Sequence, residues 1–361
     1  MFEIEKTSSL NTDKLVDGRE FDYITRTSFN QGILQRTGFI NEDSLNPSGT
    51  WSLGLLQMDF FYRQREWYAG QFVRKITPKF KMKNSVITFF TTILNSLKPI
   101  LLSVLVRDVN KTFLDLNIFL PTKNGEIDFD FMESFIAELD AQRIAELDAY
   151  LTVADLKDYE LSLEEEKVLK DLGKYDWQEF KMGDLFERIS TKKLPYKAKE
   201  LQREPKGEYT LPVLTSSFMN QGLNYFAPKT EATIIKNVIT IPSNSDIYRS
   251  YYQSRDFSVL SDAYAIKWKD KDNKLSPNGY LFAVSCINKV TDLPIYSYKN
   301  KLGGWNVVKK KHIKLPVNKN GGIDFTYMET LTQAIKKLVI KDVVLYADKK
   351  IAATKKVVGE K

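Results

Sequence analysis

Cysteine and histidine are almost absent from this 361-residue sequence, which contains one of each, Cys286 and His312. One cysteine cannot form an internal disulfide bond, and one histidine cannot build a histidine-based metal site. A catalytic triad would need His312 beside a nucleophile, but this residue lies in the basic run KKKHIK. We therefore interpret His312 as structural or solvent-facing.

Motifs that bind phosphates and nucleotide cofactors are also missing. The sequence has no G-x-x-x-x-G-K-[ST] loop and no G-x-G-x-x-G fingerprint, and residues 46–49 (NPSG) lack the aromatic residue of a methyltransferase amino-group motif. The acidic segments GEIDFDFME and GGIDFTYME are better explained as a turn followed by a helix cap than as a carboxylate metal site. We expect a non-catalytic chain that binds no metal and no cofactor of its own.

A leader and a membrane span are not indicated either. The start MFEIEKTSSL lacks a basic-then-apolar signal pattern, so the expected compartment is the cytoplasm. Residues 86–106 are apolar over about the length of a membrane span, but Asn95, Lys98 and Pro99 interrupt them. Charge and a helix breaker are costly at the centre of a bilayer, which favours a buried helix that ends near the proline. We expect no membrane association.

The chain does contain enough apolar residues to form hydrophobic cores, and it carries an excess of positive charge. Hydrophobic residues make up 43% and aromatic residues 12% of the sequence, which predicts a globular chain of two or three domains. The formal net charge is +7 and the isoelectric point is near 9.0. This balance favours a polyanionic partner.

An internal repeat of four blocks organises the sequence. FEIEKTSSL from residue 2 returns as FERISTKKL from residue 186, and TSFNQGI (27–33) returns as SSFMNQGL (216–223). FFYRQREWY (60–68) corresponds loosely to IYRSYYQSRDF (247–257), whereas IFLPTKNGEIDFDFMESF (118–135) matches IKLPVNKNGGIDFTYMETL (313–331) closely. The block YDWQEFKMGDL (175–185) precedes only the second copy. The pattern predicts two duplicated domains, of which the first looks clipped at its N-terminus.

Each copy changes from a strand-rich pattern to a helical one after a repeated asparagine-glycine turn. Asp128 and Asp324 are expected helix N-caps. Apolar residues follow at steps of three and four, which is typical of a helix face: Met132, Phe135 and Leu139 in one copy, and Met328, Leu331 and Ile335 in the other. The last helix would run from about residue 324 to 357, roughly 50 Å at about 1.5 Å per residue.

These signals predict an α+β fold in which two tandem mixed α/β domains are separated by, and followed by, long helices. The expected divisions are 1–127 for the first domain, 128–174 for a central helical connector with an interruption, 175–322 for the second domain and 323–361 for a C-terminal helix. The helices are expected to form an antiparallel, coiled-coil-like spacer, because they have too few partners in their own domains to be buried on every side. Ordinary domain packing is the alternative.

Three motifs resemble those of a known family, the specificity subunits of type I restriction-modification systems and the related DNA-recognition subunits of type II systems. They are W-x-x-F-x-[IM]-G-D-L-F-E at 177–187, the N-Q-G block of each copy, and L-P-x-x-x-N-G-x-I-D-F-x-x-M-E at the end of each copy. The resemblance covers nearly the whole chain. Two departures are the missing first W-x-x-F segment and the brevity of the connector helices.

The resemblance implies two target-recognition domains, each reading one half of a bipartite, asymmetric DNA site. It implies that the helices set the spacer and dock DNA methyltransferase subunits, two of them in the expected assembly, and it allows a restriction or translocase subunit as a further partner. S-adenosylmethionine, Mg²⁺ and ATP, where they are used, would be bound by those partner subunits.

Side-chain chemistry gives candidates for DNA contact, because Asn and Gln can pair with adenine, Arg can pair with guanine, and Ser and Thr can bind phosphates or base edges. From the N-Q-G blocks the candidates are Thr27, Ser28, Asn30, Gln31, Ser216, Ser217, Asn220 and Gln221. A scaffold or phosphate-contact role is favoured for these, since the block recurs in domains that should read different sequences. The arginine-tyrosine stretches suit groove contact better: Tyr62, Arg63, Arg65, Tyr248, Arg249, Tyr251 and Arg255.

Two other classes of function stay open. A nuclease or methyltransferase with an unrecognised site would show cofactor-dependent activity in the isolated chain. A structural or protein-interaction module built on two repeats would show no DNA affinity at any salt concentration, whereas a DNA reader binds with a steep salt dependence.

Overall fold

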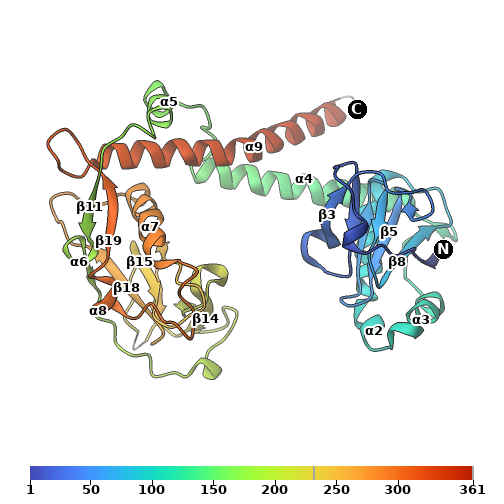
Figure 1. Ribbon diagram of the computed structural model, residues 1–361. Helices are drawn as coiled ribbons and strands as arrows, with labels where there is room; N and C mark the ends of the chain where they lie inside the picture. Colours follow the sequence, from blue (N-terminus) through green and yellow to red (C-terminus); the bar gives the residue numbers. More distant parts are fainter. Residues whose placement is uncertain (231, 360–361) are drawn as a thin grey trace. The chain divides into compact units, whose positions relative to one another are not determined.

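The computed structural model describes residues 1–230 and 232–359, with side chains as far as residue 353. The chain divides into two compact units, one built on Met1–Ala149 and the other on Tyr150–Asp348. Each unit contains a mixed α/β domain, and a long helix follows each domain in the sequence (Figure 1).

The first domain holds two four-stranded sheets. One has the antiparallel order β1 (Phe2–Lys6), β8 (Val73–Pro78), β5 (Thr50–Gly54) and β6 (Asp59–Arg63). The other has the order β3 (Ile33–Thr37), β2 (Phe21–Ile24), β7 (Trp67–Ala69) and β4 (Leu45–Asn46), in which β2 and β7 are parallel. Helices α1 (Ile87–Ser96), α2 (Lys98–Leu102) and α3 (Val109–Asp115) follow, and the hairpin β9 (Thr122–Lys123) and β10 (Glu126–Ile127) closes the domain.

The second domain repeats this plan. Its antiparallel sheet has the order β12 (Phe186–Arg188), β18 (Ala263–Trp268), β15 (Val238–Pro242) and β16 (Tyr251–Gln253). A second sheet joins β14 (Leu223–Ala227), β13 (Leu211–Leu214) and the parallel strand β17 (Ser258–Val259). The helices are α6 (Met182–Leu185), α7 (Pro277–Thr291) and α8 (Trp305–Val308). The shared strand order confirms that the sequence repeat is a repeat of folded domains.

One sheet of the second domain has no counterpart among the described residues of the first. Strand β11 (Trp177–Lys181) pairs antiparallel with β19 (His312–Pro316), and Trp177 stacks on Phe282 of α7. In the first domain the residues that match β19 include Ile118 and Leu120, which lie outside the assigned strands and are only partly buried. His312, which we interpreted as structural or solvent-facing, is an exposed residue of β19.

The apolar stretch expected to form a buried helix is folded into two helices. Residues 84–102 are long and apolar enough to span a membrane by length and composition alone. Helix α1 ends at Ser96, and Pro99 lies in the first turn of α2, where proline is tolerated. Phe90, Leu94 and Leu101 are fully buried in the core of the first domain, whereas Ile100 and Leu102 are exposed. The burial is therefore one-sided, as in an amphipathic helix, and not complete as the sequence suggested.

The long helices α4 (Phe129–Val153) and α9 (Phe325–Gly359) begin at the expected caps. Asp128 accepts a hydrogen bond from the amide of Phe131, and Asp324 accepts one from the amide of Tyr327, each at 2.9 Å. One turn later Met132 and Met328 are fully buried in the cores of their domains. The repeated I-D-F-x-x-M-E motif thus joins each long helix rigidly to the domain that precedes it.

The glutamate of the same motif completes this junction. Glu133 receives a hydrogen bond from Lys83, and hydrogen bonds from Lys83 and Ser85 hold its pKa below the ordinary value. Glu329 bonds to Asn278 at 2.7 Å and to Ser276, the N-cap of α7. In both copies the motif therefore ties the long helix to the segment that begins the main helix of the domain.

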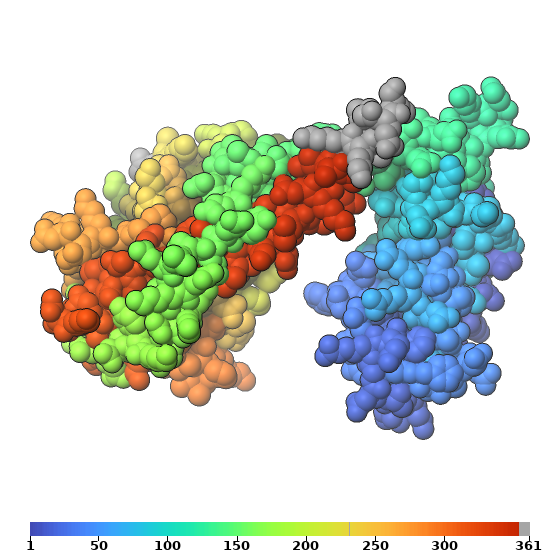
Figure 2. Space-filling model, turned by 90° about the horizontal axis from the view of Figure 1, so that it is seen from above, coloured from blue at the N-terminus to red at the C-terminus, as the bar shows by residue number. Residues whose placement is uncertain are grey.

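Lys337 of α9 is a main contact between this helix and the segment between the two copies. A capping box at Ser162 starts α5 (Leu163–Lys170). Lys337 of α9 donates to the main-chain oxygen of Glu160 and forms ion pairs with Asp158 and Glu165 at 2.8 and 3.2 Å. In Figure 2 the green segment around α5 lies against the red helix α9.

Candidate nucleic-acid interface

Both N-Q-G blocks fold into the same unusual turn. In η2 (Phe29–Gly32) the φ angles of Asn30, Gln31 and Gly32 are 47°, 53° and 79°. In η6 (Met219–Gly222) those of Asn220, Gln221 and Gly222 are 47°, 54° and 92°. Three consecutive residues in the left-handed region are costly for side chains other than glycine. A conformation kept twice at this cost must be held by its surroundings.

Hydrogen bonds within each loop, from side chains and from the main chain, stabilise part of this conformation. The amide of Phe29 donates to the hydroxyl of Thr27 at 3.2 Å, and the amide of Met219 donates to the hydroxyl of Ser217 at 3.1 Å. The amide nitrogens of Thr25 and Thr215 donate to the carbonyl oxygens of Gly32 and Gly222. Thr27 and Ser217 thus stabilise the turn, in agreement with the favoured scaffold role.

A strand residue reaches each turn from the neighbouring sheet. Arg63 of β6 donates through Nη2 to the carbonyl oxygen of Gln31 and through Nε to the hydroxyl of Ser52 at 2.9 Å. Gln253 of β16 donates through Nε2 to the carbonyl oxygen of Gln221 and to the hydroxyl of Thr240, each at 3.1 Å. We call the bond from Arg63 to Gln31, and the equivalent bond from Gln253 to Gln221, the latch of the domain.

Strand pairing shows that the two latch residues are equivalent. Tyr62 lies opposite Trp51 on β5, and Tyr252 lies opposite Ile239 on β15, so that Arg63 and Gln253 follow equivalent tyrosines. The arginine of the second stretch, Arg249, is four residues too early to match Arg63. The third repeated block therefore pairs the correct stretches of the two domains, but its residue-by-residue alignment is not given by the sequence match.

Two candidate DNA contacts are corrected by their burial. The side chain of Arg63 is enclosed, with a residue exposure of 2%, and loss of hydration lowers the pKa of its guanidinium to about 10. Tyr248 is 1% exposed and packs edge-on against Tyr296. Both side chains are therefore almost fully shielded from solvent, Tyr248 within the core of the second domain and Arg63 beneath the surface of a groove in the first.

Several other candidates are exposed or partly exposed but already bonded within the protein. The hydroxyl of Ser28 donates to Asp59, and that of Ser216 donates to Asp262 at 2.9 Å. The side-chain amide of Asn30 donates to the carbonyl oxygen of Ile33 at 3.1 Å. Arg249 pairs with Asp292 at 2.7 Å, which raises the pKa of its guanidinium, and the hydroxyl of Tyr251 donates to the carbonyl oxygen of Phe218. These residues shape the loops that surround the turn.

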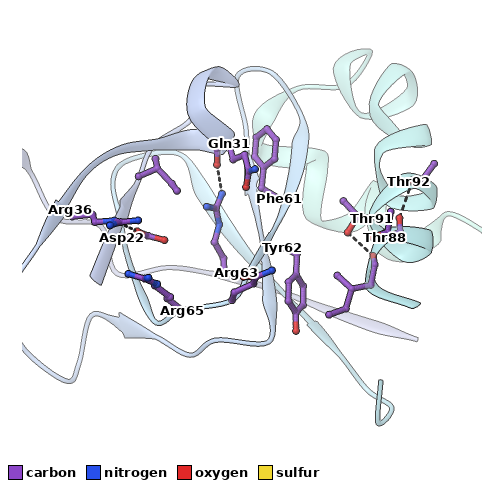
Figure 3. Close-up of a pocket in the computed structure, with 13 residues that line it drawn as sticks. Asp22, Gln31, Arg36, Phe61, Tyr62, Arg63, Arg65, Thr88, Thr91 and Thr92 are labelled. Carbon is purple, nitrogen blue, oxygen red and sulfur yellow. Dashed lines mark hydrogen bonds and ion pairs between the residues drawn. The ribbon is translucent and has the colours of Figure 1, made fainter. Parts of the chain in front are cut away.

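The remaining candidates of the first domain border an open groove of about 600 Å³. Figure 3 shows Gln31, Arg36, Tyr62 and Arg65 around it, with Thr88, Thr91 and Thr92 of α1 on one side. Arg65 is exposed, and no ion pair is found for it among the described residues. Arg36 is half-exposed and forms an ion pair with Asp22 at 3.3 Å. Arg36, Thr88 and Thr92 were missed by the sequence patterns, since they lie outside every repeated block.

The second domain has a groove of similar volume, about 610 Å³, beside its own N-Q-G loop. The groove is lined by both polar and apolar side chains, and it carries two cations and one anion, Asp262. Its lining includes Lys193, Tyr196, Lys197, Thr215, Ser216, Ser217, Asn224 and Tyr225. The exposed side chains of Asn220, Gln221 and Arg255 lie outside this lining. The lysines also lie outside the candidate set, because single lysines in a loop carry no pattern.

Three of the six residues expected to form docking faces are interior residues. Met132 and Met328 are fully buried and Leu331 is 5% exposed, so these expectations are corrected: the residues anchor the helices to their own domains. Phe135, Leu139 and Ile335 are exposed. On α9 the exposed face continues through Val339 and Val343, at further steps of four residues.

Within residues 1–230 and 232–359, no group of three or more His, Cys, Asp or Glu side chains is placed to hold a metal ion. What the two domains share is the latched turn, and each also has exposed cations in a groove near that turn, although the two grooves lie at different places in the repeated fold. Exposed guanidinium, ammonium, amide and hydroxyl groups are the groups that bind phosphates and base edges. The class of protein that this arrangement defines is a tandem-domain DNA reader.

The model of the type I restriction modification DNA specificity domain matches residues 1–149 and 174–345. The chain belongs to this family. It is therefore a non-catalytic recognition subunit of a restriction-modification system, and such subunits work in complexes with DNA and methyltransferase subunits.

The similar proteins include one curated relative and one solved structure of comparable length. The chain is 24% identical over 284 residues to the type II restriction enzyme specificity subunit S.BcgI of Heyndrickxia coagulans, covering 78% of this chain and 75% of that protein. The crystal structure of a type I restriction-modification S subunit from M. genitalium has the same fold, with a TM-score of 0.53 at 14% identity, over 99% of this chain and 91% of that one.

Proposed function

We propose that each domain reads one half of a bipartite, asymmetric DNA site. The observation that carries the proposal is the recurrence of the same latched turn in both domains, with exposed cations in a groove near the turn in each. The turns agree, whereas the grooves near them differ in place and in lining: arginines and threonines from the β6 and α1 side line the first, and lysines and tyrosines around residues 193–198 and 215–225 line the second. A common turn whose neighbouring cations differ in kind and in position suits two domains that recognise different base sequences.

Arg65 and Arg36 are our candidates for guanine or phosphate contact in the first half-site. Lys193 and Lys197 are the candidates in the second, where lysine acts as a point charge toward phosphate. Gln31 and Gln221 expose their side chains while their carbonyl oxygens are bound by the latch. They remain candidates for base contact, together with Tyr62, Asn220 and Arg255.

The long helices supply the spacer and the docking surface in this proposal. Helices of 25 and 35 residues are about 37 and 52 Å long at about 1.5 Å per residue, which is at least one turn of duplex DNA, roughly 34 Å. We propose that α4 and α9 pair antiparallel and that Phe135, Leu139, Ile335, Val339 and Val343 contribute to docking of two methyltransferase subunits. The rigid junctions at Met132 and Met328 support a spacer of fixed length.

S-adenosylmethionine, Mg²⁺ and ATP, where used, are assigned to the partner subunits, and the complex is assigned to the cytoplasm. The test is to co-express the chain with its methyltransferase subunit and to map methylated bases by direct sequencing. A two-part motif with a fixed gap is the expected result. Co-purification without any motif would contradict DNA reading and favour an interaction module, whereas cofactor-dependent activity of the isolated chain would favour an enzyme.

A further inference from the structure

The latched turn of each domain carries an apolar side chain that is largely exposed among the described residues. Phe29 is 85% exposed and Met219 is 59% exposed. The two residues are equivalent, because the amide of each donates to the hydroxyl two residues earlier, Thr27 or Ser217. Each immediately precedes the left-handed residues of its turn. Single exposed apolar residues are common on protein surfaces, but here one recurs at the same place on the same held turn in both domains, which makes it a candidate for a contact outside the chain.

The latch fixes where this tip points. It binds the carbonyl oxygen in the middle of the left-handed run, so that the turn cannot relax without breaking a bond to a sheet strand. In the first domain this bond comes from a buried guanidinium, which loses its main-chain acceptor if the turn opens. The same bond is made by a neutral glutamine in the second domain. The requirement is therefore for a donor at this position and not for a charge.

The surroundings of the tips point to nucleic acid as the partner. In the first domain the turn borders the groove through Gln31, beside Arg36 and Arg65. In the second domain the loop that leads into the turn, Thr215–Ser217, lines the groove with Lys193 and Lys197. Cations beside an apolar tip suit a duplex groove, where phosphates flank base edges and an apolar side chain can contact the thymine methyl group.

We propose that Arg63 and Gln253 are positioning residues for DNA recognition, which hold Phe29 and Met219 so that these side chains contact base edges in their respective half-sites. This inference rests on the function proposed above and assigns a role to one part of it. The contact is made by Phe29 and Met219, and the latch residues act through the turn.

The test maps methylation motifs for variants of the full chain co-expressed with its methyltransferase subunit. Phe29→Ala is expected to relax discrimination by about fivefold or more at one or two positions in one half of the motif, and Met219→Ala to do so in the other half. The unaffected half of each motif is an internal control. Leu56→Ala, which removes an exposed leucine outside the turn and the groove, is expected to leave both halves unchanged.

The latch is tested by exchanging its two residues. Arg63→Ala is expected to reproduce the Phe29→Ala motif, and Arg63→Gln to retain the wild-type motif, because glutamine makes the same bond in the second domain. Gln253→Ala and Gln253→Arg form the matching pair. A general loss of folding would weaken both halves together and would not be rescued selectively by Arg63→Gln, which separates positioning from stability.

Three outcomes overturn the inference in different ways. Unchanged motifs for Phe29→Ala and Met219→Ala would show that the tips do not touch bases. Weaker co-purification of the methyltransferase subunit with an unchanged motif would move the tips to a protein interface. If the wild-type chain itself gives no two-part motif, the proposed function fails before the latch is tested.

Discussion

Asn95 and Asn288 make the same two hydrogen bonds in different domains. The side chain of Asn95 on α1 accepts from the amide of Phe60 and donates to its carbonyl oxygen, both at 2.9 Å. Asn288 on α7 accepts from the amide of Ser250 at 2.8 Å and donates to its carbonyl oxygen at 3.2 Å. Each amide side chain thus acts as a short extra strand along the free edge of β6 or of the segment that leads into β16. We call the two hydrogen bonds of each asparagine a clamp. Each clamp holds the strand, or the segment leading into it, that carries the latch residue.

Replacing either clamp is expected to destabilise its domain. Asn95→Ala and Asn288→Ala each leave one main-chain donor and one acceptor without their partner, which costs about 1–3 kcal/mol. Urea unfolding at constant m-value measures the loss. Asn117→Ala, at an exposed position in the first domain, is the matched control and is expected to change little. Equal stability of the clamp variants and the control would contradict this role.

An ion pair beside each clamp has opposite polarity in the two domains. Asp59 on β6 pairs with Lys98 on α2, whereas Arg249 pairs with Asp292 just after α7. We expect Arg249→Asp alone and Asp292→Arg alone each to lower the unfolding free energy by about 1 kcal/mol, and the double reversal to recover most of the loss. A double-mutant cycle in denaturant measures the coupling. Additive losses would show that the pair does not couple β16 to α7.

The two faces of the long helices are expected to respond differently to truncation. Met132→Ala and Met328→Ala remove fully buried side chains and should cost about 2–5 kcal/mol. Ile335→Ala and Val339→Ala remove exposed side chains and should change stability by less than about 0.5 kcal/mol. The exposed pair is expected to weaken methyltransferase association in pull-down assays. Unchanged association would remove this face of α9 from the docking surface.

The single thiol is expected to be unreactive in the folded protein. Burial in the second domain raises the pKa of Cys286 to about 11, because the thiolate loses hydration. The thiolate fraction at pH 8 is then on the order of 10⁻³. Labelling with a disulfide reagent should be slow at pH 8 and fast in denaturant.

The raised pKa also sets the sign of a pH effect on stability. The folded state binds the thiol proton more tightly than the unfolded state, so this group loses stability as the pH rises from about 9 through about 11. Cys286→Ala should flatten the fall in stability over that interval relative to wild type. An equally steep fall in the variant would show that other groups cause it.

Local chemistry was predictable from the sequence, whereas the functions of individual side chains depended on pairing across the fold. Asp128 and Asp324 were correctly predicted as helix caps, because a cap is decided by residues within one turn. Arg63 was expected to contact DNA and is buried instead, because its environment is set by Ser52 and Gln31, residues distant in the sequence.

The sequence also did not show which residues of the two domains occupy equivalent strand positions. The loose match between the arginine-tyrosine stretches gave no residue-by-residue correspondence, whereas strand pairing shows that Gln253, and not Arg249, is the counterpart of Arg63. The residues that share this role differ in charge and shape, so no comparison of residue types would have joined them. The lysines and threonines of the grooves were missed for a related reason: they come together only when separate segments fold side by side.

The central claim is that each domain reads its own half of one site, and paired groove variants test it most directly. We would map methylated motifs for Arg36→Ala with Arg65→Ala, for Lys193→Ala with Lys197→Ala, and for wild type under the same co-expression. The account predicts that each pair degrades or relaxes a different half of the motif and preserves the other half and the gap. Equal loss in both halves from either pair, with both proteins folded, would contradict it.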